Sequence, residues 1–292
     1  MGWGVILPIL TSMAYAVTLI CLRQGIRSGT PLAGVLTINV LVSAFGIAAA
    51  WARGTLQASS LTPLLWFMAA GYLGQGIGQI TFYAGIERMG VSRATPVQSA
   101  TPIWAVLFAF AFLGERPGLA VWAGTFAIVA GVALLSLGEE GEARGRARGS
   151  RGGLVYPIVS SVLYALVPIF AKAAFAHQKT PFVGLGFAFL GGTLILLAGR
   201  PLLPGGGKVR ADGRAMRWFL LAALSTAAAA SMFWTALTFA DVAIVLPLSR
   251  LVPLWVVALS YFFLGGLERI TWPVALAALA VVAGGVLITA FR

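Results

Sequence analysis

Two stretches of the sequence, Pro96–Trp104 (PVQSATPIW) and Pro247–Trp255 (PLSRLVPLW), decide the fold because one repeats the pattern of the other. Each has two prolines six residues apart and a tryptophan two residues after the second proline. Both lie within long apolar runs, where prolines remove backbone hydrogen bonds from a helix. The second copy also holds Arg250, and a charge at membrane depth is costly unless something offsets it. The pair therefore predicts two helices that are broken at matched positions near polar groups.

Other short motifs also occur twice, in the same order in both halves of the sequence. Pro8, Ser12 and Tyr15 recur as Pro157, Ser161 and Tyr164, Thr30-Pro31 recurs as Thr180-Pro181, and LGER at 113–116 has a counterpart in LGGLER at 264–269. Such an ordered series indicates an internal duplication. Each copy has five apolar segments, and because five is odd, the copies must insert into a membrane with opposite orientations. The sequence thus predicts an inverted repeat, the architecture of many secondary transporters.

The composition places the chain in a membrane. Of its 292 residues, 60% are hydrophobic and 10% are charged, and the mean hydropathy is +0.95. A soluble domain has about 25% charged residues. The net charge of +12 comes mainly from loops between apolar segments, where basic residues set orientation and meet lipid headgroups. We therefore expect the lipid bilayer as a partner and no binding of nucleic acid.

About 20 apolar residues cross the hydrocarbon layer. By that rule the sequence predicts ten spans, at residues 3–21, 32–52, 61–84, 91–113, 118–137, 153–173, 181–199, 217–239, 242–265 and 271–290. We expect an all-α polytopic membrane protein whose ten helices form a five-plus-five inverted repeat around a central cavity. The first repeat is assigned to residues 1–141, a charged Gly/Arg linker to 142–152, and the second repeat to 153–292. Because both repeats lie in one chain, a monomer is expected.

A family resemblance follows from these features. Pro102 with the Leu-Gly-Glu-Arg run at 113–116, and Gly124 and Gly131 in the next span, resemble the EamA branch of the drug/metabolite transporter superfamily. The resemblance covers essentially the whole chain and is closest to the YddG-type exporters of amino acids. It implies export of aromatic and other neutral amino acids, or of similar small metabolites, across the bacterial cytoplasmic membrane. The second copy departs from the pattern at Gly265-Gly266 and at Ala277.

Arg250 is the residue that most needs an explanation. All eight acidic residues fall in loops or at predicted helix ends, and Asp241 is nine residues away along the chain. An ionisable residue within a membrane faces the interior of a bundle by default. Its partner is then a substrate carboxylate, which suits guanidinium geometry, or a backbone carbonyl or an acid from another helix end. Snorkelling to a lipid headgroup is a third alternative.

Other polar and aromatic residues are expected near Arg250. Gln75, Gln79 and Tyr83 are spaced four residues apart and would share one face of an α-helix. Intramembrane glutamines need partners, so they contact the substrate or join helices. The predicted substrate-binding residues are Ser12, Tyr15, Gln75, Gln79, Tyr83, Gln98, Ser99, Trp104, Tyr164, Ser231, Trp234, Ser249 and Arg250, and the predicted helix-breaking residues at the cavity are Pro96, Pro102, Pro247 and Pro253. This set suits a zwitterionic, partly apolar solute such as an amino acid.

Other functional classes fit the sequence less well. Cys21 is the only cysteine, and the only histidine, His177, lies at a predicted helix end, so no metal site and no cofactor are expected. No His-Glu-x-x-His motif and no buried aspartate are present, which argues against a membrane enzyme. GYLGQGIG at 71–78 lacks the Gly-Lys-Ser/Thr of a phosphate-binding loop, and Gly74 and Gly78 instead allow close helix approach.

Several alternatives stay open within transport. The chain could export drugs or other metabolites, whereas a nucleotide sugar with two phosphates should need more than one intramembrane cation. A channel is an alternative that saturable counterflow would exclude. Since no acid or histidine lies deep in a predicted span, we expect facilitated diffusion or exchange rather than obligatory proton coupling.

The charge count and the family resemblance predict opposite orientations in the membrane. The loops joining spans 1–2, 3–4, 5–6, 7–8 and 9–10 hold fourteen Lys and Arg residues, against five on the opposite side. By the positive-inside rule both termini then lie outside. The family resemblance implies that both lie in the cytoplasm.

Overall fold

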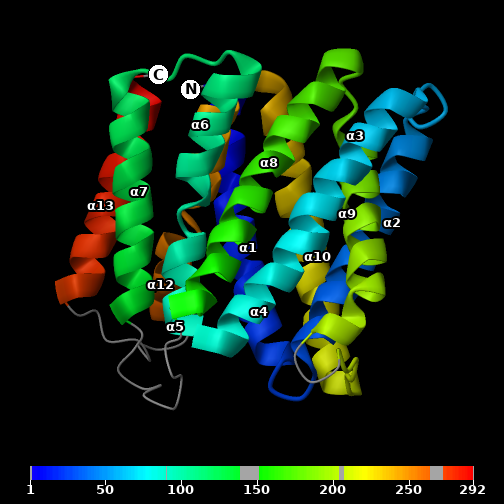
Figure 1. Cartoon of the computed structure of the whole chain (residues 1–292), viewed down its shortest axis with the longest axis horizontal. Helices are drawn as coiled ribbons and strands as arrows, with labels where there is room; N and C mark the ends of the chain where they lie inside the picture. Colours follow the sequence, from blue (N-terminus) through cyan, green and yellow to red (C-terminus); the bar gives the residue numbers. More distant parts are fainter. Residues whose placement is uncertain (1, 90, 139–150, 204–206, 264–271, 292) are drawn as a thin grey trace.

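The computed structural model describes residues 2–89, 91–138, 151–203, 207–263 and 272–291. These residues are almost entirely helical, apart from connections and an isolated β-bridge between Gly29 and Ala211. An all-helical chain agrees with the expected fold class. Figure 1 shows the helices packed side by side, with the start of the first and the end of the last on the same face of the molecule.

The helices of the first copy follow the predicted spans closely. They are α1 (Trp3–Gly25), α2 (Pro31–Ala52), α3 (Leu61–Gly71), the π-helix η1 (Tyr72–Gly78), α4 (Gln79–Met89), α5 (Val91–Gln98), α6 (Thr101–Leu113) and α7 (Leu119–Gly138). The helices of the second copy are η3 (Arg151–Leu154), α8 (Val155–His177), α9 (Pro181–Ala198), η4 (Arg200–Leu202), α10 (Gly213–Phe239), α11 (Val242–Ser249), α12 (Val252–Phe263) and α13 (Trp272–Ala290). In the described residues, six helical segments are long and apolar enough to cross a membrane.

Local sequence signals explain where several helices begin and end. The Thr30 hydroxyl accepts a hydrogen bond from the Ala33 backbone N–H, and Pro31 occupies the first turn of α2, where its missing N–H costs nothing. Asp212 caps α10 by accepting from the Ala215 N–H at 2.6 Å. Gly114 ends α6 with a φ of 69°, a left-handed conformation that glycine adopts without strain.

Two of the helices are interrupted at matched places in the two copies. α5 ends at Gln98 and α6 begins at Thr101, while α11 ends at Ser249 and α12 begins at Val252. Each break lies between two prolines, and each second helix carries its proline in the first turn. A proline in the first turn starts a helix easily but cannot continue the preceding one. The interruptions therefore follow directly from the repeated proline pair.

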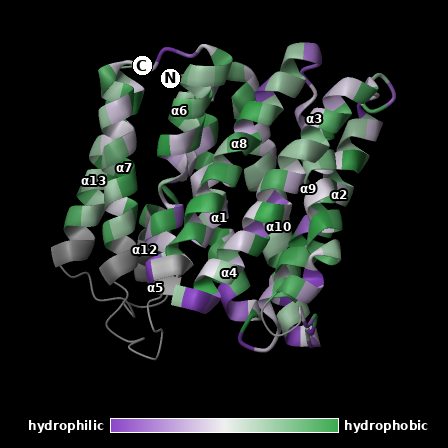
Figure 2. Ribbon diagram, viewed as in Figure 1, coloured by the Kyte–Doolittle hydropathy of each residue, from purple (hydrophilic) through white to green (hydrophobic). Residues whose placement is uncertain are grey.

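Helices from one copy pack mainly against helices from the other. α1 packs against α10, α2 against α9, α7 against α13, and α8 against α3 and η1. In Figure 1, α7 and α13 lie together at one edge, and α2 and α9 lie at the other. Apolar residues run along the helices, whereas hydrophilic residues gather at helix ends and connections (Figure 2).

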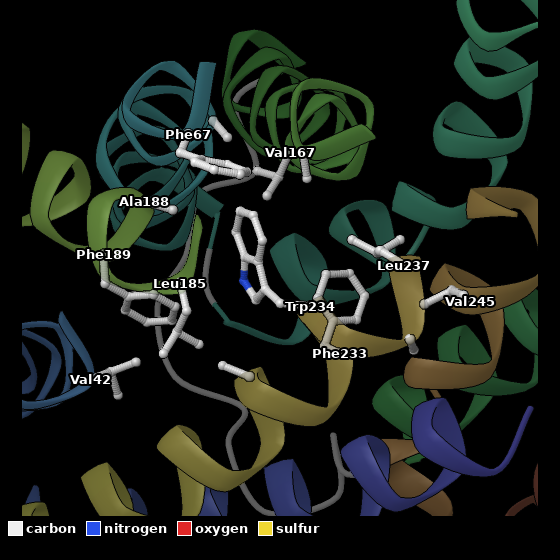
Figure 3. Packing of buried hydrophobic residues seen from close by; sticks show 14 of the residues in the cluster. Val42, Phe67, Val167, Leu185, Ala188, Phe189, Phe233, Trp234, Leu237 and Val245 are labelled. Carbon is white, nitrogen blue, oxygen red and sulfur yellow. The ribbon is translucent and has the colours of Figure 1, made fainter. Parts of the chain in front are cut away.

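The largest buried cluster lies where α3, α8, α9 and α10 meet. Trp234 is only 3% exposed and packs edge-on against Phe67 and Phe175, with ring centroids 5.7 Å and 6.2 Å away. Figure 3 shows its indole between Phe67 and Val167 on one side and Leu185 and Phe233 on the other. This cluster joins helices from both copies into one core.

Glycines bring α7 and α13 into close contact. A Cβ on Gly124 would lie 2.6 Å from the Gly284 carbonyl oxygen, and a Cβ on Gly131 would lie 2.7 Å from the Ala277 carbonyl oxygen. In the sequence repeat, Gly124 corresponds to Ala277 and Gly131 to Gly284. Gly124 therefore packs against Gly284, the counterpart of Gly131, and Gly131 packs against Ala277, the counterpart of Gly124.

Candidate functional site

Arg250 lies at the interruption between α11 and α12. Its backbone N–H donates to the Pro247 carbonyl oxygen at 3.0 Å, which turns the chain at the end of α11. The Nε atom of its guanidinium is buried, and it has no hydrogen-bond partner among the residues that the structure describes. A buried, unpartnered donor is rare and costly, so such an atom is a sound candidate for contact with a ligand.

Two tyrosines lie close enough to the guanidinium to interact with it electrostatically. Tyr15 comes from α1 and Tyr164 from α8, so Arg250 faces equivalent residues of the two sequence copies. The four acids in the described residues, Glu87, Glu115, Asp212 and Asp241, are not among the groups that act on Arg250. An acid from another helix end is therefore not its partner in the described part of the chain.

A hydrogen-bond network links the third predicted span, α5 and α8. The Gln98 amide donates to the Ser160 hydroxyl at 3.2 Å, and Ser160 donates to the Gly78 carbonyl oxygen at 2.8 Å. The Tyr164 hydroxyl donates to Gln79 Oε1. Tyr83 also forms a side-chain hydrogen bond with Gln79. Gln79, Tyr83, Gln98 and Tyr164 are thus brought together, and Ser160 is a member that the sequence analysis missed.

A second link joins α1 to α12. The Trp255 indole N–H donates to the Ser12 hydroxyl at 2.9 Å, and Ser12 donates to the Ile9 carbonyl oxygen at 2.6 Å. Ser161, the counterpart of Ser12, makes the same bond to Ile158 at 2.8 Å. Trp104, the counterpart of Trp255, stacks on Phe108 instead, so the two copies differ here.

Gln75 packs against a different helix from Gln79. Gln75 lies within η1, a π-helix of seven residues, and its Cβ packs directly against Gly192 of α9. Gln79 begins α4 and reaches α8 instead. Residues four apart stay on roughly the same side in an α-helix and in a π-helix, so the shared face of Gln75, Gln79 and Tyr83 stays a prediction. Gly74 and Gly78 do allow close approach, because a Cβ on Gly78 would lie 3.2 Å from the Tyr164 ring.

Other predicted site residues lie outside this network. Trp234 belongs to the aromatic core, and Ser231 donates to the Ala227 carbonyl oxygen within its own helix at 2.6 Å. Ser99 and Ser249 bond to the Thr95 and Leu246 carbonyl oxygens at 2.9 Å and 2.7 Å. Both therefore satisfy backbone groups beside the two helix interruptions.

Among the helix-breaking prolines, Pro102 and Pro247 are buried and Pro96 is partly buried. The side chain of Pro253 falls outside the described residues. The described residues hold no group of three or more His, Cys, Asp or Glu side chains that could bind a metal. Among the described residues, the polar region around Arg250 offers its guanidinium, tyrosine hydroxyls and amide groups, which can bind a small polar solute.

Comparison with known proteins supports the fold of this chain. A comparison with curated protein sequences finds no match. A solved structure described only as "Crystal structure of protein" is similar, with a TM-score of 0.79, 22% sequence identity, and coverage of 98% of this chain and 96% of that chain. At that identity the likeness shows the fold alone.

The family comparison covers both sequence copies. The model of the EamA-like transporter family matches residues 2–137 and again residues 151–290. The family model thus matches the chain twice, once in each half. With nearly the whole length matched, the chain belongs to the EamA-like transporter family, and it is a membrane transporter of the drug/metabolite transporter superfamily.

Proposed function

We propose that the chain exports amino acids or similar small carboxylates across the bacterial cytoplasmic membrane, with Arg250 binding the substrate carboxylate. The observation that carries this proposal is the buried Nε of Arg250, which has no partner among the described residues. A carboxylate can accept bonds from guanidinium nitrogens in a bidentate, charge-assisted pair. The nearby tyrosines and the amides of Gln79 and Gln98 suit the polar groups of an amino acid.

The architecture we infer for this function is an inverted repeat of ten spans. The crosswise contacts between α7 and α13 support it, because an antiparallel pair of equivalent helices would exchange its positions in this way. A second matched pair gives further support: Gly4 packs against Ala240, and its counterpart Gly153 packs near Met89. In such folds the substrate site lies at the repeat interface near discontinuous helices, and the two halves rock about it in alternating access.

The energy source we propose is a substrate gradient. Proton-coupled transporters typically carry an ionisable acid or histidine within the membrane. The described acids Glu87, Glu115, Asp212 and Asp241 lie at helix ends or in connections. Facilitated diffusion or exchange needs no such group. Transport that collapses when a pH gradient is dissipated at constant voltage would contradict this part of the proposal.

The experiment that tests the substrate is counterflow in liposomes that contain the purified protein. A panel of labelled amino acids is compared for the native chain, Arg250→Ala and Arg250→Lys, with Arg217→Ala as a control for an exposed arginine. We expect saturable exchange that is lost in Arg250→Ala and is not restored by lysine, which lacks the bidentate geometry. Exchange that survives in Arg250→Ala would return Arg250 to a structural role. If only drugs or other metabolites are exchanged, amino acids are not the substrate class.

Orientation needs a test in cells, because reconstitution in liposomes need not keep the native direction of insertion. The face that carries η4 and the start of α10 also holds most of the basic residues, which supports placing that face in the cytoplasm and both termini outside. A reporter fused after Arg292 measures this directly.

A further inference from the structure

Glu115 holds the start of a helix that belongs to the other copy. Its two carboxylate oxygens accept hydrogen bonds from the backbone N–H groups of Val242 at 2.9 Å and Ala243 at 3.0 Å. These are the first two residues of α11. The first four N–H groups of a helix have no partner within it, so a carboxylate placed there satisfies groups that would otherwise be exposed or orphaned.

The side chain of the N-cap residue of α11 forms no capping hydrogen bond. Asp241 occupies the N-cap position with φ −69° and ψ 149°, the extended conformation that N-cap residues adopt. Aspartate is among the best N-cap residues, yet the side chain of Asp241 forms no capping bond. A carboxylate from the first copy has taken the place of the local one.

This contact joins the two parts of the molecule that would have to separate on one face. Glu115 lies in the connection between α6 and α7, immediately after the left-handed Gly114 that ends α6. α11 ends at the interruption that holds Arg250. The connection lies on the face where α1 begins and α13 ends (Figure 1). Any opening of this face toward Arg250 has to move α11 relative to α6.

We propose that Glu115 is a releasable clasp that closes this face of the transporter, and that Asp241 takes over the capping of α11 when the clasp opens. The proposal rests on the alternating access put forward above. As the N-cap residue, Asp241 can accept from the Ala243 N–H that Glu115 gives up, and the Val242 N–H is left to water on the opened face. Release therefore leaves one N–H group without a protein acceptor instead of two, which lowers the penalty that would otherwise hold the face shut.

The surroundings of Glu115 agree with release. Burial raises the pKa of its carboxyl, while the bonds from Ala243 and Val242 and the charge of Lys172 on α8 lower it. The charge of Asp241 acts in the same direction as burial. Because the raising effects prevail, the ionised carboxylate is held less firmly than two hydrogen bonds alone suggest.

The test measures access to the Arg250 level from each face. Cys21 is replaced by alanine, a reporter cysteine is placed at the buried Ser249, and a membrane-impermeant thiol reagent is added from one side of a proteoliposome. Glu115→Ala removes the clasp, so modification from the terminal face should accelerate about tenfold or more. Asp241→Ala removes the alternative cap, so modification should slow about fivefold. Glu87→Ala, an exposed acid at the end of α4, is the control and should change neither rate.

The two variants are expected to change the modification rate in opposite directions, which makes the outcome decisive. Unchanged modification in Glu115→Ala, or faster modification in Asp241→Ala, overturns the proposal. Should Glu115→Ala fail to fold, Asp241→Ala still tests it, together with hydrogen exchange of the Val242 and Ala243 amides, which should slow in that variant. The assay needs no substrate. A failure of amino-acid counterflow with the two opposite responses intact would therefore reject the substrate and leave the clasp standing.

Discussion

The hydrogen bond between the Trp255 indole N–H and the Ser12 hydroxyl joins the two copies, and its contribution can be measured. Ser12 is fully buried, and the two atoms are 2.9 Å apart. Ser12→Ala leaves the indole N–H without an acceptor, which costs about 1–3 kcal/mol in a buried site. Trp255→Phe removes the donor, while Ser12 keeps its own bond to the Ile9 carbonyl oxygen. The double variant should therefore be less destabilised than the sum of the single variants.

The coupling energy expected from this cycle is about 0.6 kcal/mol and at most about 1.7 kcal/mol, the average and the maximum for side-chain hydrogen bonds between membrane helices. It is measured by reversible unfolding in mixed micelles, followed by far-UV circular dichroism so that the loss of a tryptophan does not affect the signal. The matched control is the equivalent cycle in the other copy, Ser161→Ala with Trp104→Phe. Trp104 stacks on Phe108 and makes no hydrogen bond to Ser161 in the described structure, so its coupling should be near zero. Equal coupling in the two cycles, or none for Ser12 and Trp255, would refute the reasoning.

Two further variants test the helix packing and the capping. Gly71→Ala places a Cβ against the Ala188 carbonyl oxygen and should destabilise the protein by about 3 kcal/mol, because backbone cannot move aside as a flexible side chain can; Gly118→Ala, which meets nothing within 4 Å, should leave the unfolding midpoint unchanged. The bond from the Ala215 N–H lowers the pKa of Asp212, so the stability it contributes is present above the ordinary aspartate pKa and is lost as the pH falls through the lowered value. Asp212→Ala should accordingly lower the Tm at neutral pH, and the difference from the native chain should shrink in acid; a difference independent of pH would count against the cap.

The repeat in the sequence predicted much of the fold, because each signal was local. Proline pairs specify where a helix cannot continue, and the interruptions at Ser99–Ala100 and Arg250–Leu251 fall between them. Long apolar segments specify helices, and their ends agree with the predicted spans to within a few residues at most places. The depth of Arg250 in an apolar run was likewise enough to single it out as a site candidate.

The parts that sequence reasoning missed depend on contacts between the copies. Gln75 lies in the π-helix at Tyr72–Gly78 and packs against α9, and no periodicity in the sequence marks such a change of hydrogen-bond register. Ser160 joins the network only because Gln98 and the Gly78 carbonyl oxygen come to it from other helices. Glu115 reads as an ordinary loop acid, and only the approach of α11 gives it a partner. Long-range packing decides all of these.

The close pairing of α7 with α13 constrains how the two halves can diverge. One small-residue motif is present twice, and each of its positions faces the non-equivalent position of the other copy. Ala277 carries a methyl group that Gly124 lacks, but a Cβ on Gly131 would meet the Ala277 carbonyl oxygen and not this methyl group. Removing the Ala277 methyl group therefore makes no room for a Cβ on Gly131, and Gly131→Ala with Ala277→Gly should be tolerated no better than Gly131→Ala alone. Backbone contact therefore holds Gly124, Gly131 and Gly284 to glycine whichever side chain stands on the opposite helix.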